Sequence, residues 1–205
     1  MDRSEELQFI CKEGNWNEKW VGVDEAGAGA LCGPVVAAAC YVPQHVDIHP
    51  LIQDSKKMTF QNRLDVFEYL TLHDDIEFDV TFIDPVEIDD INILQARLKA
   101  MGTSIDNMKA SLALVDGDKS PCRYCNCKIC TFVKGDNRMY SIACASIIAK
   151  VSRDLYMLRM AEIYPQYDIY SNFGYGTPKH LQALQEHKAV PFFHRFSYKV
   201  VENNS

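Results

Sequence analysis

The chain has 205 residues, of which 47% are apolar and 24% charged, which suits one globular domain with a sizeable core. Its formal net charge of −7 excludes a protein that binds nucleic acid through an overall basic surface. An acidic chain can still hold divalent cations among carboxylates and present them to phosphate. The polar first residues and the shortness of the most apolar stretch, 34–43, predict a cytoplasmic protein without membrane partners.

The hydrophobic pattern predicts strands and helices that alternate along the chain. Apolar or alternating runs closed by polar, Gly or Pro residues indicate strands at 19–24, 34–41, 76–83, 111–115 and 130–133. Apolar residues at helical spacing indicate helices at 7–12, 60–72, 91–101, 139–163 and 177–187. An early run of strands followed by strand–helix alternation favours an α/β domain with a mixed sheet.

Acidic residues recur where the predicted strands end. Asp24 and Glu25 follow the first strand, Asp116 follows a later one, and Asp136 precedes the longest helix. Carboxylates at strand ends can converge, and oxygen ligands without a His or Cys pattern suit Mg²⁺ or Mn²⁺. Two such ions about 3.5–4 Å apart can clamp the attacking and leaving oxygens of a phosphodiester. Asp is also common in turns and helix caps, so the spacing alone leaves both interpretations open.

A glycine-rich loop connects the first two strands, with glycines at positions 27, 29 and 33. Glycine lets a backbone approach a ligand closely and expose its N–H groups. A plain flexible connection is the alternative interpretation.

Segments in a fixed order over residues 20–198 resemble the signatures of the ribonuclease HII family. They are Gly22-Val23-Asp24-Glu25-Ala26-Gly27 with Gly29 and Gly33-Pro34, Asp54-Ser55-Lys56-Lys57-Met58-Thr59, Asn92-Ile93-Leu94-Gln95-Ala96 with Met101, Val115-Asp116-Gly117, Lys134-Gly135-Asp136, the helical stretch 141–154, Gly174-Tyr175-Gly176-Thr177, His180, and His194-Arg195. A chance match of this length and order is very improbable.

This resemblance implies a ribonuclease-H-like α/β fold, with a five-stranded mixed sheet flanked by helices and with C-terminal helices appended. We expect one catalytic domain, 1–205, and a monomer. The four carboxylates Asp24, Glu25, Asp116 and Asp136 would bind Mg²⁺ or Mn²⁺ and carry catalysis. The implied reaction is endonucleolytic hydrolysis of RNA in RNA/DNA hybrids and 5′ of ribonucleotides in duplex DNA, which leaves 5′-phosphate and 3′-hydroxyl ends.

The resemblance also implies a set of nucleic-acid contacts. They are Gly27, Ala28, Gly29, Lys56, Lys57, Asn92, Ser146, Lys150, Tyr175, His194 and Arg195. Tyr175 corresponds to the tyrosine that stacks on the sugar at an RNA–DNA junction. Lys150 is expected to contact phosphate, and a surface pair with Asp154 is the alternative. For His194 and Arg195, phosphate binding and C-terminal packing both remain open.

Two positions depart from the family pattern. The family loop carries Arg or Lys between its glycines, where this chain has Ala28. Ala28 keeps the backbone N–H but lacks the cation, so substrate binding is expected to weaken about ten- to a hundredfold. A natural variant that is active on hybrids with relaxed junction specificity, an engineered substitution and a silent change are the explanations left open. Arg97 stands where the family often has Thr, and it could replace the missing charge or face solvent.

A cysteine-rich insert, 122–130, lies between Asp116 and Asp136. Its cysteines are Cys122, Cys125, Cys127 and Cys130. Two C-x2-C pairs suggest a structural Zn²⁺ site, although the gap between the pairs is unusually short. Reduced surface thiols, or a disulfide formed on isolation, are the alternatives.

Three other functions compete with this interpretation. Ribonuclease HIII is disfavoured, because that sister family has an extra N-terminal domain and a Glu at the fourth carboxylate. A catalytically weak hybrid-binding protein would explain Ala28 and the acidic charge, but four intact carboxylates argue against it. An α/β domain with ordinary turn carboxylates does not explain the ordered series of motifs.

Overall fold

The computed structural model describes residues 2–13, 18–52 and 58–204. Its helices and strands follow one another in the order α1 (Ser4–Glu13), β1 (Trp20–Ala26), β2 (Val35–Tyr41), α2 (Phe60–Leu72), β3 (Glu77–Ile83), α3 (Pro85–Ile91), α4 (Ile93–Asn107), β4 (Leu112–Asp116), β5 (Lys128–Phe132), η2 (Gly135–Asn137), α5 (Tyr140–Ile163), η3 (Pro165–Tyr167), α6 (Ile169–Asn172), α7 (Pro178–His187) and α8 (Lys199–Glu202). No helix within these ranges is long and apolar enough to cross a membrane.

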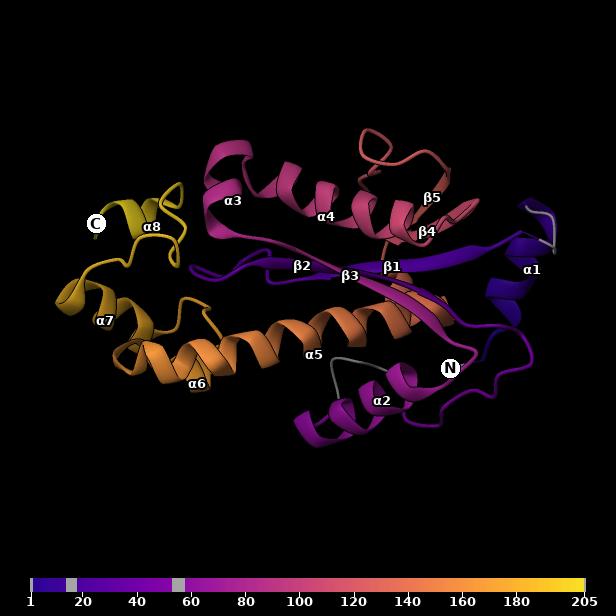
Figure 1. The fold of residues 1–205 in the computed structure, drawn as a ribbon, viewed down its shortest axis with the longest axis horizontal. Coiled ribbons are helices and arrows are strands. Elements are labelled where there is room, and N and C mark those ends of the chain that lie inside the picture. Colours follow the sequence, from indigo (N-terminus) through magenta and orange to yellow (C-terminus); the bar gives the residue numbers. More distant parts are fainter. Residues whose placement is uncertain (1, 14–17, 53–57, 205) are drawn as a thin grey trace.

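The strands form one five-stranded mixed sheet in the order β3-β2-β1-β4-β5. β2 pairs antiparallel with both β1 and β3, whereas β4 pairs parallel with both β1 and β5. Figure 1 shows α3 and α4 on one face of the sheet and α2 and α5 on the other. The predicted α/β class and five-stranded mixed sheet are confirmed.

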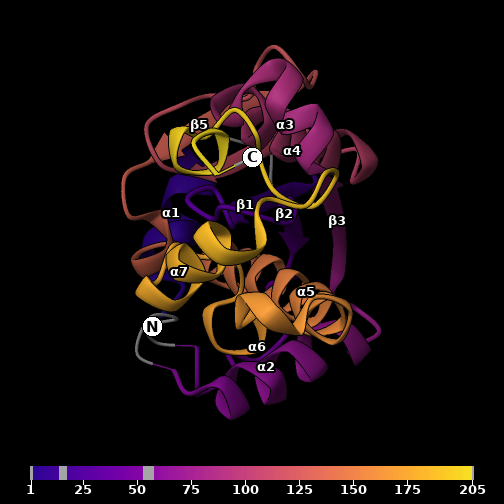
Figure 2. The ribbon, with the colours of Figure 1, turned by 90° about the vertical axis from the view of Figure 1, so that its left-hand side faces the viewer.

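The core is split by the sheet into two main layers. Val66 and Leu70 of α2 pack with Ile148 of α5 on one face, and Met101 and Ile105 of α4 pack on the other. The short C-terminal helices form an end layer of their own, seen in front in Figure 2, around a separate apolar cluster. The fold therefore has an α/β/α sandwich with an appended C-terminal lobe.

Two predicted boundaries differ from the structure. The first strand continues through Ala26, since its pairing with β2 extends to Val36, so Asp24 and Glu25 lie within β1 rather than after it. The helix predicted at 91–101 begins at Ile93 as α4, and a separate helix that was not predicted, α3, ends at Ile91. Asn92 separates them with a φ of 66°, and its side-chain oxygen accepts from the backbone N–H of Gln95 to cap α4.

Gly22 allows α5 to lie directly against β1. A Cβ added at Gly22 would be 2.1 Å from the backbone carbonyl carbon of Ser141 and 2.2 Å from the nitrogen of Ile142. Any side chain at this position would push the helix away from the strand. The close approach brings Ser146 and Lys150 of α5 beside the carboxyl end of β1.

Gly22→Ala should lower Tm, because overpacking costs about 1–3 kcal/mol and each kcal/mol shifts Tm by roughly 2–4 °C at this size. Differential scanning calorimetry measures the change. Gly29→Ala is the matched control, since no atom lies within 4 Å of a Cβ added there. Equal losses in both variants would contradict close packing of α5 on β1.

Candidate active site

The four predicted catalytic carboxylates line one pocket of about 460 Å³. Parallel pairing of β1 and β4 brings their carboxyl ends together, and η2 follows β5 to add Asp136 from the same edge. The pocket is lined by Asp24, Glu25, Ala26, Gly27, Arg63, Asp116, Asp136, Ser146, Ile147, Lys150 and Tyr175. Residues far apart in the sequence therefore meet at one acidic site.

Asp24 and Glu25 are two pocket carboxyls whose pKa values are raised. Burial raises the pKa of Asp24 well above its usual value, the negative charges of Glu25 and Asp116 raise it further, and a hydrogen bond with Ser146 opposes the rise. Burial also raises the pKa of Glu25, against the opposing effect of Arg97. Such crowded, desolvated carboxylates disfavour their own ionised state unless cations enter the pocket.

Arg97 provides one such cation from α4. Its Nη1 lies 3.3 Å from Oε1 of Glu25, and the two side chains are 24% and 14% exposed. The structure thus excludes a purely solvent-facing Arg97 and directs its charge toward a carboxylate. This contact was not predictable from the helical pattern, which does not show which strand end a helix faces.

Asp116 and Asp136 are held by local hydrogen bonds. The backbone N–H of Gly135 donates to Oδ1 of Asp116 at 2.6 Å, which ties the start of η2 to the end of β4. The side-chain amide of Asn137 donates to Oδ1 of Asp136 at 2.9 Å. These contacts orient both carboxylates before any ligand enters.

An aromatic and cationic wall faces the acidic residues. The Tyr175 ring is 36% exposed and lies under Lys150 and Arg153, whose charged groups are 5.7 and 5.3 Å from the ring centroid. Lys150 also bonds Asp154 at 2.8 Å, so the predicted helix pair and a position in the pocket wall coexist. Arg63 of α2 lines the same pocket, and no motif in the sequence singled it out.

His194 and Arg195 do not face the pocket. Both side chains are 0% exposed. Arg195 donates to the backbone carbonyls of Gly33 and Ala28, both at 3.0 Å, and so supports the glycine-rich loop from below. Of the two interpretations left open by the sequence, complete burial favours C-terminal packing over direct contact with phosphate.

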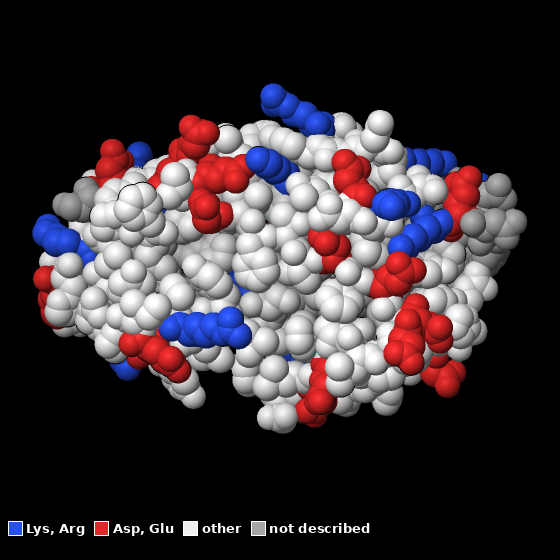
Figure 3. Space-filling model, in the orientation of Figure 1, with Lys and Arg blue, Asp and Glu red and all other residues white. Residues whose placement is uncertain are grey.

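Asn92, another predicted contact, is not among the residues that line this pocket. Asn92 caps α4 and lines a separate hollow with Leu31 and Tyr198. Lys56 and Lys57 fall outside the residues that the structure describes. Figure 3 shows acidic and basic side chains interspersed on the face that it presents, without one continuous basic band among the described residues.

The cysteine-rich insert brings some of its thiols together, but not all four. The side chains of Cys125 and Cys127 interact with each other, and Cys122 lies near enough to raise the pKa of Cys125. Cys125 and Cys127 pack toward the α4 layer, whereas β5 turns Cys130 to the opposite face of the sheet, against the cluster that contains Ile10. The insert is instead docked on α4 by Tyr124, whose hydroxyl bonds Gln95. The prediction of a zinc site from Cys122, Cys125, Cys127 and Cys130 is therefore not supported, because successive residues of a strand face opposite ways.

Comparison with known proteins identifies the family. The sequence model described as ribonuclease HII matches residues 21–201. The chain belongs to the ribonuclease HII family. It is 42% identical to ribonuclease HII of Thermosynechococcus vestitus over 95% of this chain and 91% of that protein, and 44% identical to that of Nostoc sp. over 87% and 80%. The chain is accordingly an endoribonuclease, a hydrolase of the ribonuclease H type.

Solved structures of the ribonuclease HII and HIII families share the fold. The Archaeoglobus fulgidus ribonuclease HII, solved with PCNA, has a TM-score of 0.75 and 25% identity, covering 88% of this chain and 95% of that one. The Bst ribonuclease HIII, solved with Mn²⁺, has a TM-score of 0.76 over 91% of this chain and 69% of that one, and at 16% identity it supports the fold alone.

Asp24→Asn should raise Tm at pH 8 by a few degrees, because the folded protein then no longer holds a buried carboxylate that the unfolded chain would solvate. Because the pKa of Asp24 is raised in the folded protein, the native Asp24 takes up a proton as the pH falls toward 3.8, and the cost of burying its charge disappears. The difference in Tm between the native protein and Asp24→Asn should therefore shrink at low pH. Thermal unfolding in the presence of a metal chelator at several pH values measures this difference in Tm. Asp74→Asn, at an exposed residue, is the control, and equal shifts in both variants would contradict the assigned burial.

Arg97→Thr should raise the pKa of Glu25 further, because burial then acts without the opposing guanidinium. Carboxyl ¹³C NMR titration of the metal-free protein measures it. Lys99→Thr removes the same charge from the same helix, but Lys99 bonds Glu87 at 2.5 Å and should leave Glu25 unchanged. An unchanged Glu25 pKa in Arg97→Thr would rule out the ion pair in solution.

Proposed function

We propose that the chain hydrolyses the RNA strand of RNA/DNA hybrids and cuts duplex DNA 5′ of embedded ribonucleotides, leaving 5′-phosphate and 3′-hydroxyl ends. The observation that carries the proposal is the convergence of Asp24, Glu25, Asp116 and Asp136 in one pocket that Tyr175 and Lys150 also line. Water adds to phosphorus while the 3′ oxygen leaves as the hydroxyl, so the ends follow from the bond that breaks.

The four carboxylates fit Mg²⁺ or Mn²⁺. They offer hard oxygen ligands at a pocket open to phosphate, and their mutual repulsion with burial favours the entry of divalent cations. Such cations would polarise the scissile phosphate and lower the pKa of the attacking water. The Bst ribonuclease HIII, which shares the fold, was solved with Mn²⁺.

The chain's own residues would position the substrate. Tyr175 offers an exposed ring on which a sugar or base can stack, and Lys150 beside it can contact the adjoining phosphate. These contacts would place one phosphodiester over the carboxylates. Ser146, hydrogen-bonded with Asp24, would keep that carboxylate turned into the pocket.

The glycine-rich loop can contact the junction through its backbone. The carbonyl of Ala28 accepts hydrogen bonds from Arg195 at 3.0 Å and from the Tyr198 hydroxyl at 2.7 Å, so it points inward. In a trans peptide the N–H of the next residue points the opposite way. The N–H of Gly29 therefore faces outward, where it can donate to a 2′-hydroxyl without a side-chain cation at position 28.

The proposal is tested with two labelled substrates, a DNA duplex with one ribonucleotide and a continuous RNA/DNA hybrid, each with Mg²⁺, Mn²⁺ or chelator. Both should be cut only with metal, and the single ribonucleotide on its 5′ side. Asp116→Asn should reduce kcat by roughly 10³-fold, since metal-assisted charge stabilisation is worth several kcal/mol.

Ala28→Arg should lower KM by about ten- to a hundredfold by restoring a charged hydrogen-bond donor, with little change in kcat. If only the hybrid is cut and Ala28→Arg restores cutting at the single ribonucleotide, the missing cation sets junction recognition. If neither protein cuts either substrate but both bind them, the chain is a hybrid-binding protein and the nuclease proposal fails.

A further inference from the structure

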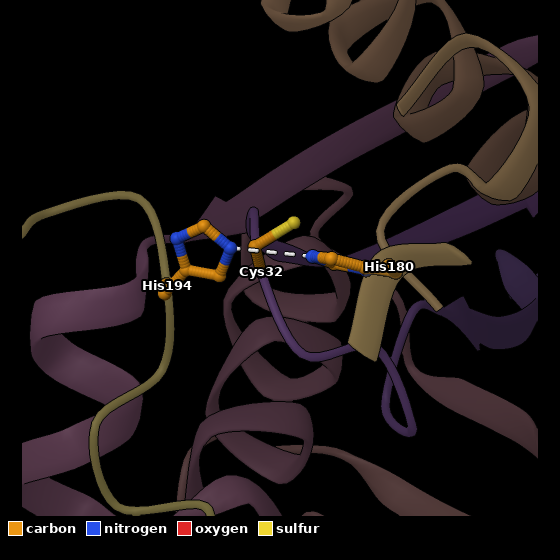
Figure 4. Close-up of side chains that lie close together, drawn as sticks. All are labelled: Cys32, His180 and His194. Carbon is orange, nitrogen blue, oxygen red and sulfur yellow. Dashed lines mark hydrogen bonds between the residues drawn. The ribbon is translucent and has the colours of Figure 1, made fainter. Parts of the chain in front are cut away.

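A buried group of three side chains lies beneath the segment that carries Tyr175. Cys32, His180 and His194 are each 0% exposed, and one ligand atom of each lies within 4.8 Å of the other two. They come from the loop before β2, from α7 and from the C-terminal segment, and Figure 4 shows the two rings joined by a hydrogen bond beside Cys32. Their spacing suits either a metal ion or a chain of hydrogen bonds.

The backbone partners of the two rings decide where the protons lie. The N–H of Val190 donates to Nδ1 of His194 at 3.0 Å, so the proton of a neutral His194 ring is on Nε2. That Nε2 lies 3.2 Å from Nε2 of His180 and must donate to it. The proton of His180 is then on Nδ1, which lies 3.0 Å from the carbonyl oxygen of Tyr175 and donates to it.

This order of protons is incompatible with a metal ion shared by the two rings. A metal at both Nε2 atoms needs a lone pair on each, and His194 would then have to be a fully deprotonated ring because Val190 already donates to its Nδ1. The positive charges of Arg153 and Arg195 also act on Cys32, and they disfavour a metal cation at the same place. Burial raises the pKa of Cys32 to about 12, so it remains a thiol.

The chain of hydrogen bonds ends on the backbone of Tyr175. That carbonyl also accepts from the N–H of Thr177 at 2.8 Å, and the N–H of Tyr175 donates to the carbonyl of Asn172 at 2.9 Å. The Tyr175 backbone is thus held on both sides, while its ring stays in the pocket wall.

We propose that His194 and His180 are positioning residues that form a neutral relay, from the N–H of Val190 to the carbonyl of Tyr175, and so hold the Tyr175 ring ready for the substrate. The relay joins the C-terminal segment to the active-site wall through two buried rings that never touch substrate. Its effect on substrate binding rests on the proposed function, whereas its order of protons does not.

The first test measures the tautomers of the native protein by ¹H–¹⁵N correlation of the imidazole nitrogens at neutral pH. His194 should carry its proton on Nε2 and His180 on Nδ1, and added Zn²⁺ should leave both patterns unchanged. The relay would be overturned in favour of a metal site if both rings had the same tautomer, or if one equivalent of Zn²⁺ bound and shifted the imidazole ¹⁵N signals of both histidines.

The second test separates positioning of Tyr175 from a merely structural role. His180→Asn places an amide N–H near the position of Nδ1 and should keep most of the affinity for an RNA/DNA hybrid, measured with Ca²⁺ to prevent cutting. His180→Leu lacks that donor and should weaken binding about five- to a hundredfold, the range that one stacked base is worth.

The same pair of variants is then made in Tyr175→Ala. There His180→Leu should cause no further loss of affinity, because no ring remains to be positioned. An equal loss in both backgrounds would overturn the positioning role. If the native protein neither binds nor cuts the hybrid, the proposed function fails, and the tautomer measurement still decides whether the relay exists.

Discussion

The crowding of buried carboxylates at the centre of the sheet is the constraint on which the rest of the structure depends. Asp24 is 7% exposed in the middle strand, and Glu25 and Asp116 add like charge beside it. Like charges in a low-dielectric site repel strongly, so the apolar layers on both faces of the sheet must supply the stability that this site lacks. The same repulsion makes the pocket receptive to divalent cations, and so to a polyanionic substrate despite the acidic chain.

Buried positive charge complements this acidic site from behind. Arg153 and Arg195 are each 0% exposed, and the hydrogen bonds found for them go to backbone carbonyls and one tyrosine hydroxyl. The carbonyl of Ala28 turns inward to Arg195, which leaves the peptide N–H of Gly29 turned outward. The loop thereby keeps a donor surface although Ala28 has no cation, and the His194–His180 relay keeps Tyr175 beside it.

The hydrophobic pattern of the sequence predicted the strands well, but it did not predict which residues pack together. Apolar runs and the turn residues that bound them placed every strand of the sheet to within a few residues, since a strand buried on both faces is recorded in the sequence as a short apolar run. The cysteine-rich insert was misjudged because the sequence does not show on which face of the sheet each cysteine lies. Spacing shows that Cys127 and Cys130 are close along the chain, but only the pairing of β5 shows that Cys130 lies on the other face of the sheet from Cys125 and Cys127.

The sequence by itself determined the family and the α/β class and predicted the four carboxylates that line the pocket, because those depend on residue types in a fixed order. Tertiary structure alone decided which charges meet: Arg97 reaches Glu25, and Arg195 lies under the loop instead of at the surface. Such contacts join α4 to β1 and the C-terminal segment to residue 28. Their partners are distant in the chain, and a single sequence carries no signal for a pairing that only the packing of the layers creates.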